Sequence, residues 1–428
     1  MVIKSRKAKL QNYLKVKGHL TIFAEKIADR LMKQIDRRGS YSIKVDAIAK
    51  YFGSDDLIPL WVADMDFETP ECIKKALDNI VQQGVYGYNH IPDNYFPTIA
   101  NWLEQKQGWR VEKDWIAFIP GIVKGIGYVI NHFTKPGDNI IVQPPIYPPF
   151  MNLPKGNGRN LLFNPLIRDE ENEAHPYRMD FDNLETLCKE NNCRLLILSN
   201  PHNPAGIAWD KETLQRLATI CHRYNVLVIS DEIHADMPLF GNRHTPFASV
   251  SEEAAQISIT FGAPSKTFNM AGIVSSFTVV PNSALREPFF KWMQVNELSS
   301  PTIFATLGAI AAYREGNAWR EKMLSYIEEN VLYIERYCKE ELQGLIKPLR
   351  PQSSFLIWLD CRPLCEKLFG GTDQMKLVHL FIKKAKLALN DGAAFGPGGE
   401  GYMRLNIGCG RDVLQQAMEQ LKGAIFGE

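Results

Sequence analysis

The sequence predicts an α/β fold, in which a mostly parallel β-sheet is covered by helices and followed by a smaller α+β domain. Through the middle of the chain, short apolar runs typical of buried strands alternate with helical stretches, which is the pattern of a parallel sheet with crossover helices. Around residues 340–350 this alternation stops, and one strand is followed by two helices. The change of pattern predicts the second domain.

The first clear element is a helix that begins near Thr69. We expect the Thr69 hydroxyl to cap the helix, Pro70 to take the first helical position and Glu71 to favour the positive end of the helix. Gly84 can end it. Its apolar face is formed by Ile73, Leu77 and Ile80.

Later apolar runs predict buried strands at residues 140–143, 195–199, 226–230 and 257–261. Between the second and third of these strands a helix opens near Asp210, and its apolar face carries Leu214, Leu217, Ala218 and Cys221. The helix-rich stretch 302–340 is expected to link the two domains. The second domain should contain a strand at 354–360 and helices at 373–388 and 411–425.

This order of elements predicts four parts: an N-terminal extension of unknown role (1–31), a segment that joins the small domain (32–82), a large domain (83–325) and a C-terminal small domain (326–428). The extension is rich in Lys and Arg, but it lacks the apolar region and cleavage site of a signal peptide. Met32 is an alternative first residue, because the patterned sequence begins directly after it.

The composition points to a globular protein that binds a small molecule. The 428 residues are 45% apolar and 23% charged, and the formal net charge is +1, so bulk charge favours neither nucleic acid nor an anionic membrane as a partner. No apolar run reaches the roughly 18 residues of a membrane span. The 8 cysteines show neither a CxxC pair nor metal-binding spacing. We therefore expect reduced thiols, no bound metal and a cytoplasmic location.

Polar residues follow the predicted strands where each of them ends. Residues 200–206 (NPHNPAG) include Asn203, residues 231–234 (DEIH) include Asp231 and His234, and Lys266 follows Ser265 after the strand at 257–261. In open α/β sheets, ligands bind beyond the carboxyl ends of the strands. An amide, a carboxylate and a lysine amine are therefore expected at one site.

Pyridoxal 5′-phosphate (PLP) requires this set of groups. Its aldehyde needs a lysine amine, here Lys266, to form a Schiff base. Its pyridine nitrogen needs an anion, which Asp231 can supply, and its phenolate oxygen needs a donor, which the Asn203 amide can supply. Tyr147, after the strand at 140–143, can stack on the ring. Each residue alone has an ordinary interpretation as a turn, a surface lysine, a solvated strand end or a core tyrosine, but their common position at strand ends favours PLP.

The phosphate of PLP needs backbone N–H groups at the start of a helix. Residues 120–127 (PGIVKGIG) precede a helical stretch and offer such a turn, in which Ile122 and Val123 supply the first N–H groups. The turn is not GxGxxG, and no acidic ribose ligand is evident, which argues against a dinucleotide site.

In these residues the chain resembles the fold-type I PLP-dependent enzymes of the aspartate aminotransferase superfamily. Within that superfamily it resembles the MalY/PatB-type cystathionine β-lyase (C–S lyase) branch. The resemblance runs from about residue 33 to the end and includes further motifs at residues 35–40 (IDRRGS), 61–67 (WVADMDF), 86–88 (YGY), 299–301 (SSP), 358–360 (WLD) and 401–406 (GYMRLN). It implies a large domain with a mostly parallel seven-stranded sheet between helices and a smaller α+β domain.

The resemblance also implies roles for single residues. Lys266 becomes the Schiff-base lysine and proton shuttle, and Arg404 binds the substrate α-carboxylate, a bidentate task that suits Arg. Tyr88, and with it Ser300, is expected to reach the cofactor of a second subunit, so a homodimer with shared sites is implied. Further contacts to the cofactor are implied for Ile122, Val123, His234 and Ser265, and further contacts to the substrate for Ala63 and Asn203.

The chain departs from the branch pattern at a few positions. Lys124 stands where a small, apolar or aromatic residue is usual, so it either adds a phosphate contact or points to solvent. Ala263 lacks a hydroxyl that many relatives place near the phosphate. Substrate choice is expected to depend on distant segments, namely Trp61, Asp64, Tyr88 and the loop 390–400.

The leading hypothesis is α,β-elimination from an L-amino acid with a sulfur leaving group, such as L-cystathionine, to give a thiol, pyruvate and ammonia. The alternative is an aminotransferase, because the motifs for the shared steps do not separate the two reactions. A third interpretation is a regulator that binds a transcription factor through an exposed apolar patch. Fold alone decides among none of these.

Overall fold

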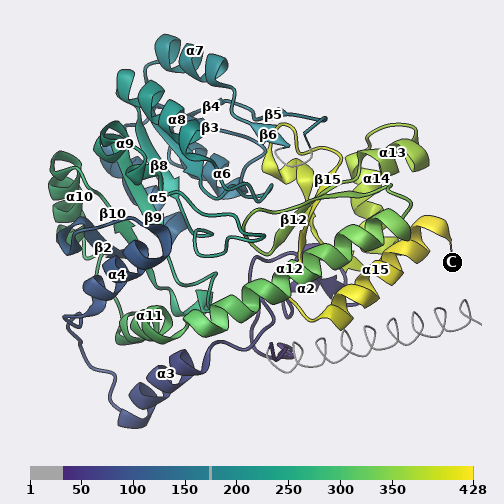
Figure 1. The fold of residues 1–428 in the computed structure, drawn as a ribbon, viewed down its shortest axis with the longest axis horizontal. Helices are drawn as coiled ribbons and strands as arrows, with labels where there is room; N and C mark the ends of the chain where they lie inside the picture. The colour runs from purple at the N-terminus through teal and green to yellow at the C-terminus, as the bar shows by residue number, and fades with distance from the viewer. Residues whose placement is uncertain (1–31, 173–175, 428) are drawn as a thin grey trace, which may run out of the picture.

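The computed structural model describes residues 32–172 and 176–427. The expectations for residues 1–31 therefore lie outside the described residues. Figure 1 shows two parts: a large sheet with its helices, and a smaller part built mainly from the C-terminal hundred or so residues (drawn in green to yellow).

A seven-stranded sheet forms the centre of the large part, in the order β2–β10–β9–β8–β7–β3–β4. β10 pairs antiparallel with both β2 and β9, whereas the other pairs are parallel. The prediction of a mostly parallel sheet of seven strands is confirmed. Its strands are β2 (Ile116–Ile119), β3 (Asn139–Val142), β4 (Asn160–Phe163), β7 (Cys193–Ser199), β8 (Leu227–Asp231), β9 (Ser258–Gly262) and β10 (Ser276–Val279).

Helices cover both faces of this sheet, so its central strands are buried on both sides. In β7, Leu195 and Ile197 pack with one group of helices while Leu196 and Leu198 pack with the other, as a parallel strand between two helical layers requires. One layer contains α5 (Ile122–Phe133), α6 (Pro148–Gly156) and α10 (Ser283–Val295), and the other contains α7 (Phe181–Asn191), α8 (Lys211–Arg223) and α9 (Glu252–Ile257).

The helix predicted after Thr69 is present, but its start was predicted wrongly. α3 spans Glu71–Gln83, Pro70 is its N-cap residue, and no side chain caps it. The Thr69 hydroxyl instead donates to the Asn269 carbonyl at 2.9 Å, a partner that local sequence rules do not include. Gly84 ends the helix in the left-handed conformation, as expected. By contrast, the start predicted for α8 near Asp210 is confirmed, and Asp210 is its N-cap, accepting from the Thr213 N–H.

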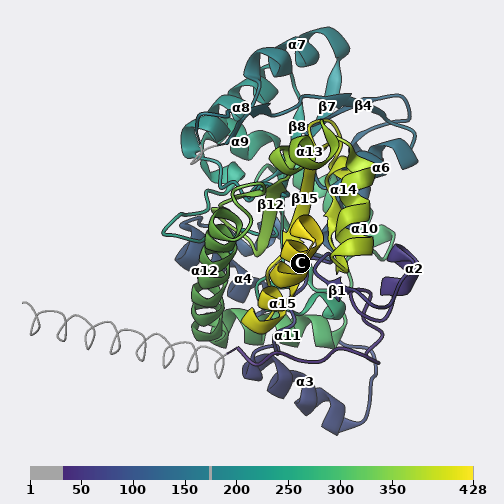
Figure 2. The ribbon, with the colours of Figure 1, turned by 90° about the vertical axis from the view of Figure 1, so that its right-hand side faces the viewer.

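The small part contains an antiparallel sheet in the order β11–β12–β15–β14. Figure 2 shows α12 and α15 side by side against it. The helix predicted at 373–388 is shorter than expected, since α14 ends at His379, a π-helical turn follows, and residues 387–388 form a strand. The elements here are β11 (Lys347–Leu349), β12 (Leu356–Asp360), β13 (Leu387–Ala388), β14 (Asn390–Asp391), β15 (Tyr402–Asn406), α12 (Asn317–Glu340), α13 (Arg362–Phe369), α14 (Gln374–His379) and α15 (Arg411–Phe426).

The other regular elements are short or lie at the edges of the large part. They are α2 (Ile48–Phe52), β1 (Ile58–Pro59), α4 (Tyr95–Gln107), β5 (Ile167–Arg168), β6 (Tyr177–Arg178) and α11 (Ile303–Glu315). Together α11 and α12 occupy the stretch that was predicted to be helix-rich. None of the helices described, over residues 32–172 and 176–427, is long and apolar enough to cross a membrane.

The N-terminal segment packs into the small part. β1 pairs in parallel with β13. The Leu60 N–H donates to the Ala388 carbonyl, and the Leu60 carbonyl accepts from the Asn406 N–H. Leu60, Met65 and Phe67 are buried in the same apolar cluster as the small-domain strands. These contacts support the proposal of a small-domain segment for residues 58–67. The last part of the predicted range, 32–82, differs, because α3 packs against α11 and shares an apolar cluster with strands of the large part.

The packing of Leu60 predicts how a smaller side chain there changes the stability of the protein. Leu60 is fully buried, so Leu60→Ala should lower the free energy of unfolding by about 2–5 kcal/mol, because it removes buried methyl groups and leaves a cavity. Urea unfolding measures this change. The control is Leu368→Ala, at an exposed position of α13; an equally small effect for both variants would mean that the N-terminal segment adds nothing to the small-domain core.

Candidate active site

Three of the predicted site residues lie at the carboxyl edge of adjacent parallel strands. Asp231 is the last residue of β8, Asn203 lies in the turn after β7, and Lys266 lies in the turn after β9. Because β7, β8 and β9 are neighbours and parallel, their ends open at the same edge. The structure thus brings together the groups that the sequence placed at strand ends.

Asp231 is a buried carboxyl group without a cationic partner. It is 7% exposed, and its Oδ1 accepts from the Ile233 N–H at 3.1 Å. Within residues 32–172 and 176–427, no ion pair joins it to a basic side chain. Burial raises its pKa to about 7, and the nearby Lys266 charge only partly opposes this. A cation placed beside Asp231 would restore its charge.

Lys266 is held by a backbone carbonyl. Its Nζ donates to the Ala63 oxygen at 2.6 Å, across 203 residues of sequence. Burial lowers its pKa to about 8; the charges of Asp64 and Asp231 oppose this change, and the charge of Arg404 adds to it. An amine with a pKa near 8 is available as a base or nucleophile near neutral pH.

Arg404 is a buried guanidinium that contacts only neutral acceptors. It lies on β15 and is 4% exposed. Its Nη1 donates to Asn203 Oδ1 at 3.0 Å, and its Nη2 donates to Asn390 Oδ1 at 2.7 Å and to the Trp61 carbonyl at 3.2 Å. Its Nε is buried with no hydrogen-bond partner among the described residues, and no carboxylate there pairs with it. Burial lowers its pKa to about 10.

Tyr147 and His234 lie within the electrostatic field of the same charges. The pKa of Tyr147 is raised by burial, lowered by Arg404 and raised by Asp231, so the ring lies near both groups. Burial lowers the pKa of His234 to about 3, and the charges of Lys266 and Arg404 add to this effect. His234 is therefore neutral, and its Nδ1 has no partner among the described residues.

The predicted phosphate turn is an uncapped helix N-terminus. Gly121 precedes α5 with a φ of 107°, a left-handed value that favours glycine, and no side chain caps the helix. Gly125 allows α5 to lie close to the sheet, since a Cβ there would come within 2.8 Å of the Phe261 ring. Free N–H groups at such a terminus attract an anion.

The residues around this turn differ in exposure. Ile122 is buried, whereas Val123 and Lys124 are exposed. Ala263 and Ser265, which precede Lys266, are both buried.

Tyr88 and Ser300 do not join this cluster within one chain. Tyr88 is fully exposed, and Ser300 is exposed, with its hydroxyl 3.5 Å from Glu297 Oε2. The two segments are nevertheless neighbours, because the Asn89 amide donates to the Pro301 carbonyl at 3.3 Å.

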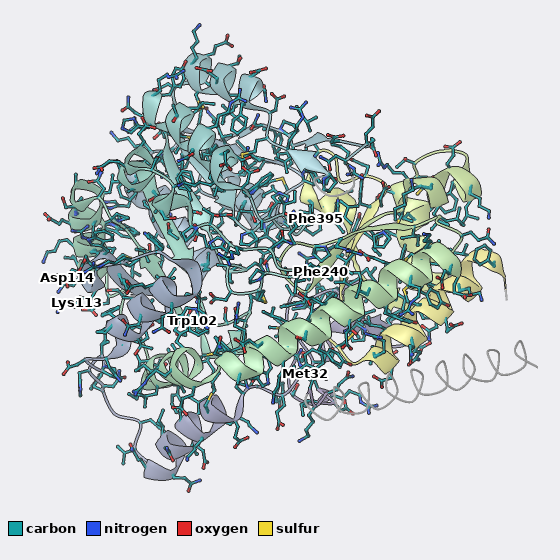
Figure 3. All side chains as sticks on the ribbon, in the orientation of Figure 1. Met32, Trp102, Lys113, Asp114, Phe240 and Phe395 are labelled. Carbon is teal, nitrogen blue, oxygen red and sulfur yellow. The ribbon has the colours of Figure 1, made fainter. Side chains whose placement is uncertain are left out.

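Some residues of the site were not predicted. Asn390, which bonds Arg404, lies opposite it in the β14–β15 register, and the sequence indicated only the loop to which it belongs. Phe395 lies at the junction of the two parts (Figure 3), and its ring is 5.0 Å from the Arg404 guanidinium. Asn406 was quoted only as part of a motif, although alternation along a strand places it on the same face as Arg404.

The chain is similar to known proteins over most of its length. Residues 55–421 match the family model "Aminotransferase class I and II". The chain is 40% identical over 393 residues to "Cystathionine beta-lyase PatB" of Bacillus subtilis, which covers 92% of this chain and 99% of that protein. It is 31% identical to "Protein MalY" of Escherichia coli, over 92% of this chain and 98% of that protein. The crystal structure of a PLP-bound C–S lyase from Staphylococcus hominis superposes with a TM-score of 0.83 at 28% identity, covering 92% and 97% of the two chains.

The chain belongs to the class I and II aminotransferase family of fold-type I PLP-dependent enzymes. Within this family it belongs to the carbon–sulfur lyase branch that contains PatB and MalY.

The buried groups of the site fit PLP. In the part of the chain that the structure describes, Asp231 accepts from a backbone N–H, no side chain caps the N-terminus of α5, and Lys266 donates to a neutral carbonyl. A pyridinium nitrogen, a phosphate and an aldehyde are the complementary groups. None of these three groups of PLP is assigned to Arg404, so Arg404 remains available to bind a further anion.

The lowered pKa of Lys266 predicts how the stability of the chain depends on pH. The pKa of Lys266 is about 8 in the folded chain, against 10.5 as its ordinary value, so between these values the unfolded chain binds a proton that the folded chain does not. Stability should therefore rise with pH in this window. At pH 7 and without cofactor, the free energy of unfolding of Lys266→Met should be about 2–3 kcal/mol higher than that of wild type. This difference should become smaller towards pH 10.

Urea unfolding at both pH values measures this difference. Lys124→Met, at an exposed position of α5, serves as the control and should change stability by no more than about 0.5 kcal/mol at either pH. A Lys266→Met advantage that did not depend on pH would contradict the assignment of a depressed pKa.

Proposed function

We propose that the protein, a PLP-dependent carbon–sulfur lyase, cleaves L-cystathionine or a related cysteine conjugate by α,β-elimination, giving a thiol, pyruvate and ammonia. The names of its relatives support a lyase, and the buried groups of the site support an amino-acid substrate.

The observation that carries the proposal is the Arg404 guanidinium. A buried cation that contacts only neutral oxygens and leaves one N–H unpaired is costly unless an anion binds there. The α-carboxylate of an amino acid is a planar, bidentate acceptor that matches a guanidinium. Asn203 and Asn390 hold Nη1 and Nη2 and so fix the plane of this group.

The other side chains have roles that follow from their chemistry. PLP, when bound, supplies the electron sink that makes the Cα proton of the substrate acidic. Lys266 would hold the cofactor and then take this proton at Nζ, since a pKa of about 8 leaves part of the amine neutral near neutral pH. Asp231 would face the pyridine nitrogen, Asn203 the phenolate oxygen and Tyr147 the ring face. The N-terminus of α5, with Ile122 and Val123, would hold the phosphate.

The alternative function is transamination, which the family as a whole includes by name. Both reactions need the same carboxylate site, base and cofactor, so the described side chains serve either one. The two reactions differ in what they require. Elimination gives pyruvate without any acceptor, whereas transamination needs a 2-oxo acid.

The test is a pyruvate assay with L-cystathionine and no added 2-oxo acid. Wild type should release pyruvate and a thiol in equal amounts, and Lys266→Ala should lose at least about 10³-fold in kcat, because both the covalent attachment and the base are removed. If L-cystathionine alone gave neither pyruvate nor thiol, but an added 2-oxo acid were converted to the corresponding amino acid, the assignment would move to an aminotransferase. The matched control is Lys211→Ala, at an exposed position of α8, which should retain turnover.

We also propose a homodimer in which each site is completed by the other subunit. Tyr88 is exposed and lies among other exposed apolar side chains, namely Val85 and Tyr86. The segment that carries them contacts Pro301, next to Ser300. An aromatic cluster of this kind is typical of a surface that is covered in the assembled protein.

Mixing two variants tests the shared site. Lys266→Ala and Tyr88→Ala should each lose most activity, but a refolded equimolar mixture should regain up to about a quarter of wild-type activity, because half of the dimers are mixed and each holds one intact site. Sedimentation of the wild type gives the oligomeric state. A monomer, or a mixture no more active than the average of the two variants alone, would contradict the proposal.

A further inference from the structure

The segment 61–67 lies between the two charged side chains that react with or bind the proposed substrate. At one end the Trp61 carbonyl accepts from Arg404 Nη2. Two residues later the Ala63 carbonyl accepts from Lys266 Nζ. Backbone carbonyls of this segment therefore contact both nitrogens. Arg404 has two further partners, Asn203 and Asn390, whereas the Ala63 carbonyl is the one hydrogen-bond acceptor of Lys266 among the described residues.

A tight turn presents the Ala63 carbonyl. The Asp64 N–H donates to the Val62 carbonyl at 2.9 Å, which closes a three-residue turn with Ala63 at its centre. The Asn406 amide of β15 donates to the carbonyls on either side, to Val62 at 2.5 Å and to Asp64 at 2.7 Å. Asn406 of the small-domain strand β15 thus bonds the residues on both sides of Ala63, whose carbonyl bonds Lys266.

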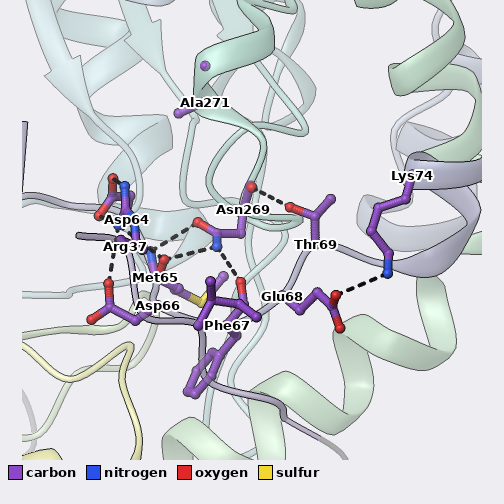
Figure 4. Close-up of a pocket in the computed structure, with 12 residues that line it drawn as sticks. Arg37, Asp64, Met65, Asp66, Phe67, Glu68, Thr69, Lys74, Asn269 and Ala271 are labelled. Atoms are coloured by element: carbon purple, nitrogen blue, oxygen red, sulfur yellow. Dashed lines mark hydrogen bonds and ion pairs between the residues drawn. The ribbon is translucent and has the colours of Figure 1, made fainter. Parts of the chain in front are cut away.

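Asn269 holds the same segment from the other side. Its Nδ2 donates to the Met65 carbonyl at 2.9 Å and to the Phe67 carbonyl at 2.7 Å, and its Oδ1 accepts from the Met65 N–H at 3.1 Å. Figure 4 shows this amide directed at residues 65–67. Both the N–H and the carbonyl of Met65 thus bond this one side chain, three residues after Lys266, and Arg37 Nη1 is a second, longer donor to the Met65 carbonyl at 3.5 Å.

The backbone at Asn269 supports this arrangement. Its φ of 52° lies in the left-handed region, which Asn tolerates better than most residues. Its own carbonyl accepts from the Thr69 hydroxyl, so the contact continues beyond Phe67. The turn that carries Lys266 is therefore tied to residues 65–69 by both the side chain and the main chain of one asparagine.

We propose that Asn269 is a positioning residue for Lys266, because its carboxamide holds the segment 61–67 where the Ala63 carbonyl receives the lysine amine. The hydrogen bond fixes Nζ whenever the amine is free, so that its lone pair stays directed into the site. Asn269 itself touches neither substrate nor cofactor. The inference rests on the proposed role of Lys266 as the lysine that holds PLP.

The variant that separates this role from backbone strain is Asn269→Gly. Glycine accepts a φ of 52° without strain, so the substitution removes the three amide hydrogen bonds and leaves the backbone conformation available. Asn192→Gly is the matched control, since Asn192 is an exposed asparagine with a φ of 45°. Asn269→Asp is a second variant, which keeps an acceptor for the Met65 N–H but places oxygen against two carbonyl oxygens.

The full-length protein is measured in three ways. Hydrogen exchange at the Asp64 and Met65 amides reports whether the segment is held. The rate at which the cofactor-free chain attaches added PLP to Lys266 reports the position of the amine, and kcat with KM for L-cystathionine reports catalysis. In Asn269→Gly, exchange should quicken, while attachment and kcat should both fall about tenfold or more. KM should change less than about threefold, because Asn203 and Asn390 still hold Arg404.

Two results would overturn the proposal. Exchange that stays slow in both Asn269 variants would mean that the amide does not hold the segment. Faster exchange with unchanged attachment and kcat would mean that the segment does not position the lysine. Failure of the proposed function has a different signature, since wild type itself would then attach no PLP at Lys266 or would release no pyruvate.

Discussion

The site depends on the burial of charged groups that form no hydrogen bond or ion pair with an oppositely charged side chain among the described residues. Asp231, Lys266 and Arg404 all lose water on folding, and in the described chain each is met only by neutral hydrogen-bonding groups. Such burial is unfavourable on its own, and it shifts all three pKa values toward the neutral form. In the proposed complex a pyridinium nitrogen would face Asp231 and a carboxylate would face Arg404, so part of the energy lost on folding would be recovered on binding.

The large sheet makes this burial possible. Strands covered by helices on both faces give a rigid edge, and the turns after β7, β8 and β9 place an amide, a carboxyl and an amine along it. Arg404 comes from the other sheet, on β15. The two parts of the molecule contact each other at Phe395, whose carbonyl accepts from the Ile146 N–H at 2.7 Å and whose ring lies beside the Arg404 guanidinium.

The N-terminal segment ties these two parts to each other. It pairs with β13, lies along β15 and is held from the large part by Asn269. Movement of one part against the other would therefore displace the Ala63 carbonyl and the Trp61 carbonyl together. A single segment thus links the position of the proposed base to that of the proposed carboxylate site.

The sequence by itself determined the strands β3, β7, β8, β9 and β12 and the chemistry that follows the large-sheet strands, but it did not locate β2, β4 or β10. Buried strands produce continuous apolar runs, and the polar residue that follows such a run must lie at the sheet edge; for this reason Asn203, Asp231 and Lys266 could be placed together without coordinates. Boundaries came out within one or two residues for β3, β7, β8, β9 and β12.

Only the tertiary structure decided which groups meet across the chain. Thr69 was expected to cap α3, but its hydroxyl bonds the carbonyl of Asn269, 200 residues away. The contacts from Ala63 to Lys266 and from Asn390 to Arg404 likewise join separate segments. Local patterns reflect the periodicity and capping of single elements, whereas these hydrogen bonds depend on how the two sheets and the N-terminal segment pack, and packing is a property of the whole chain.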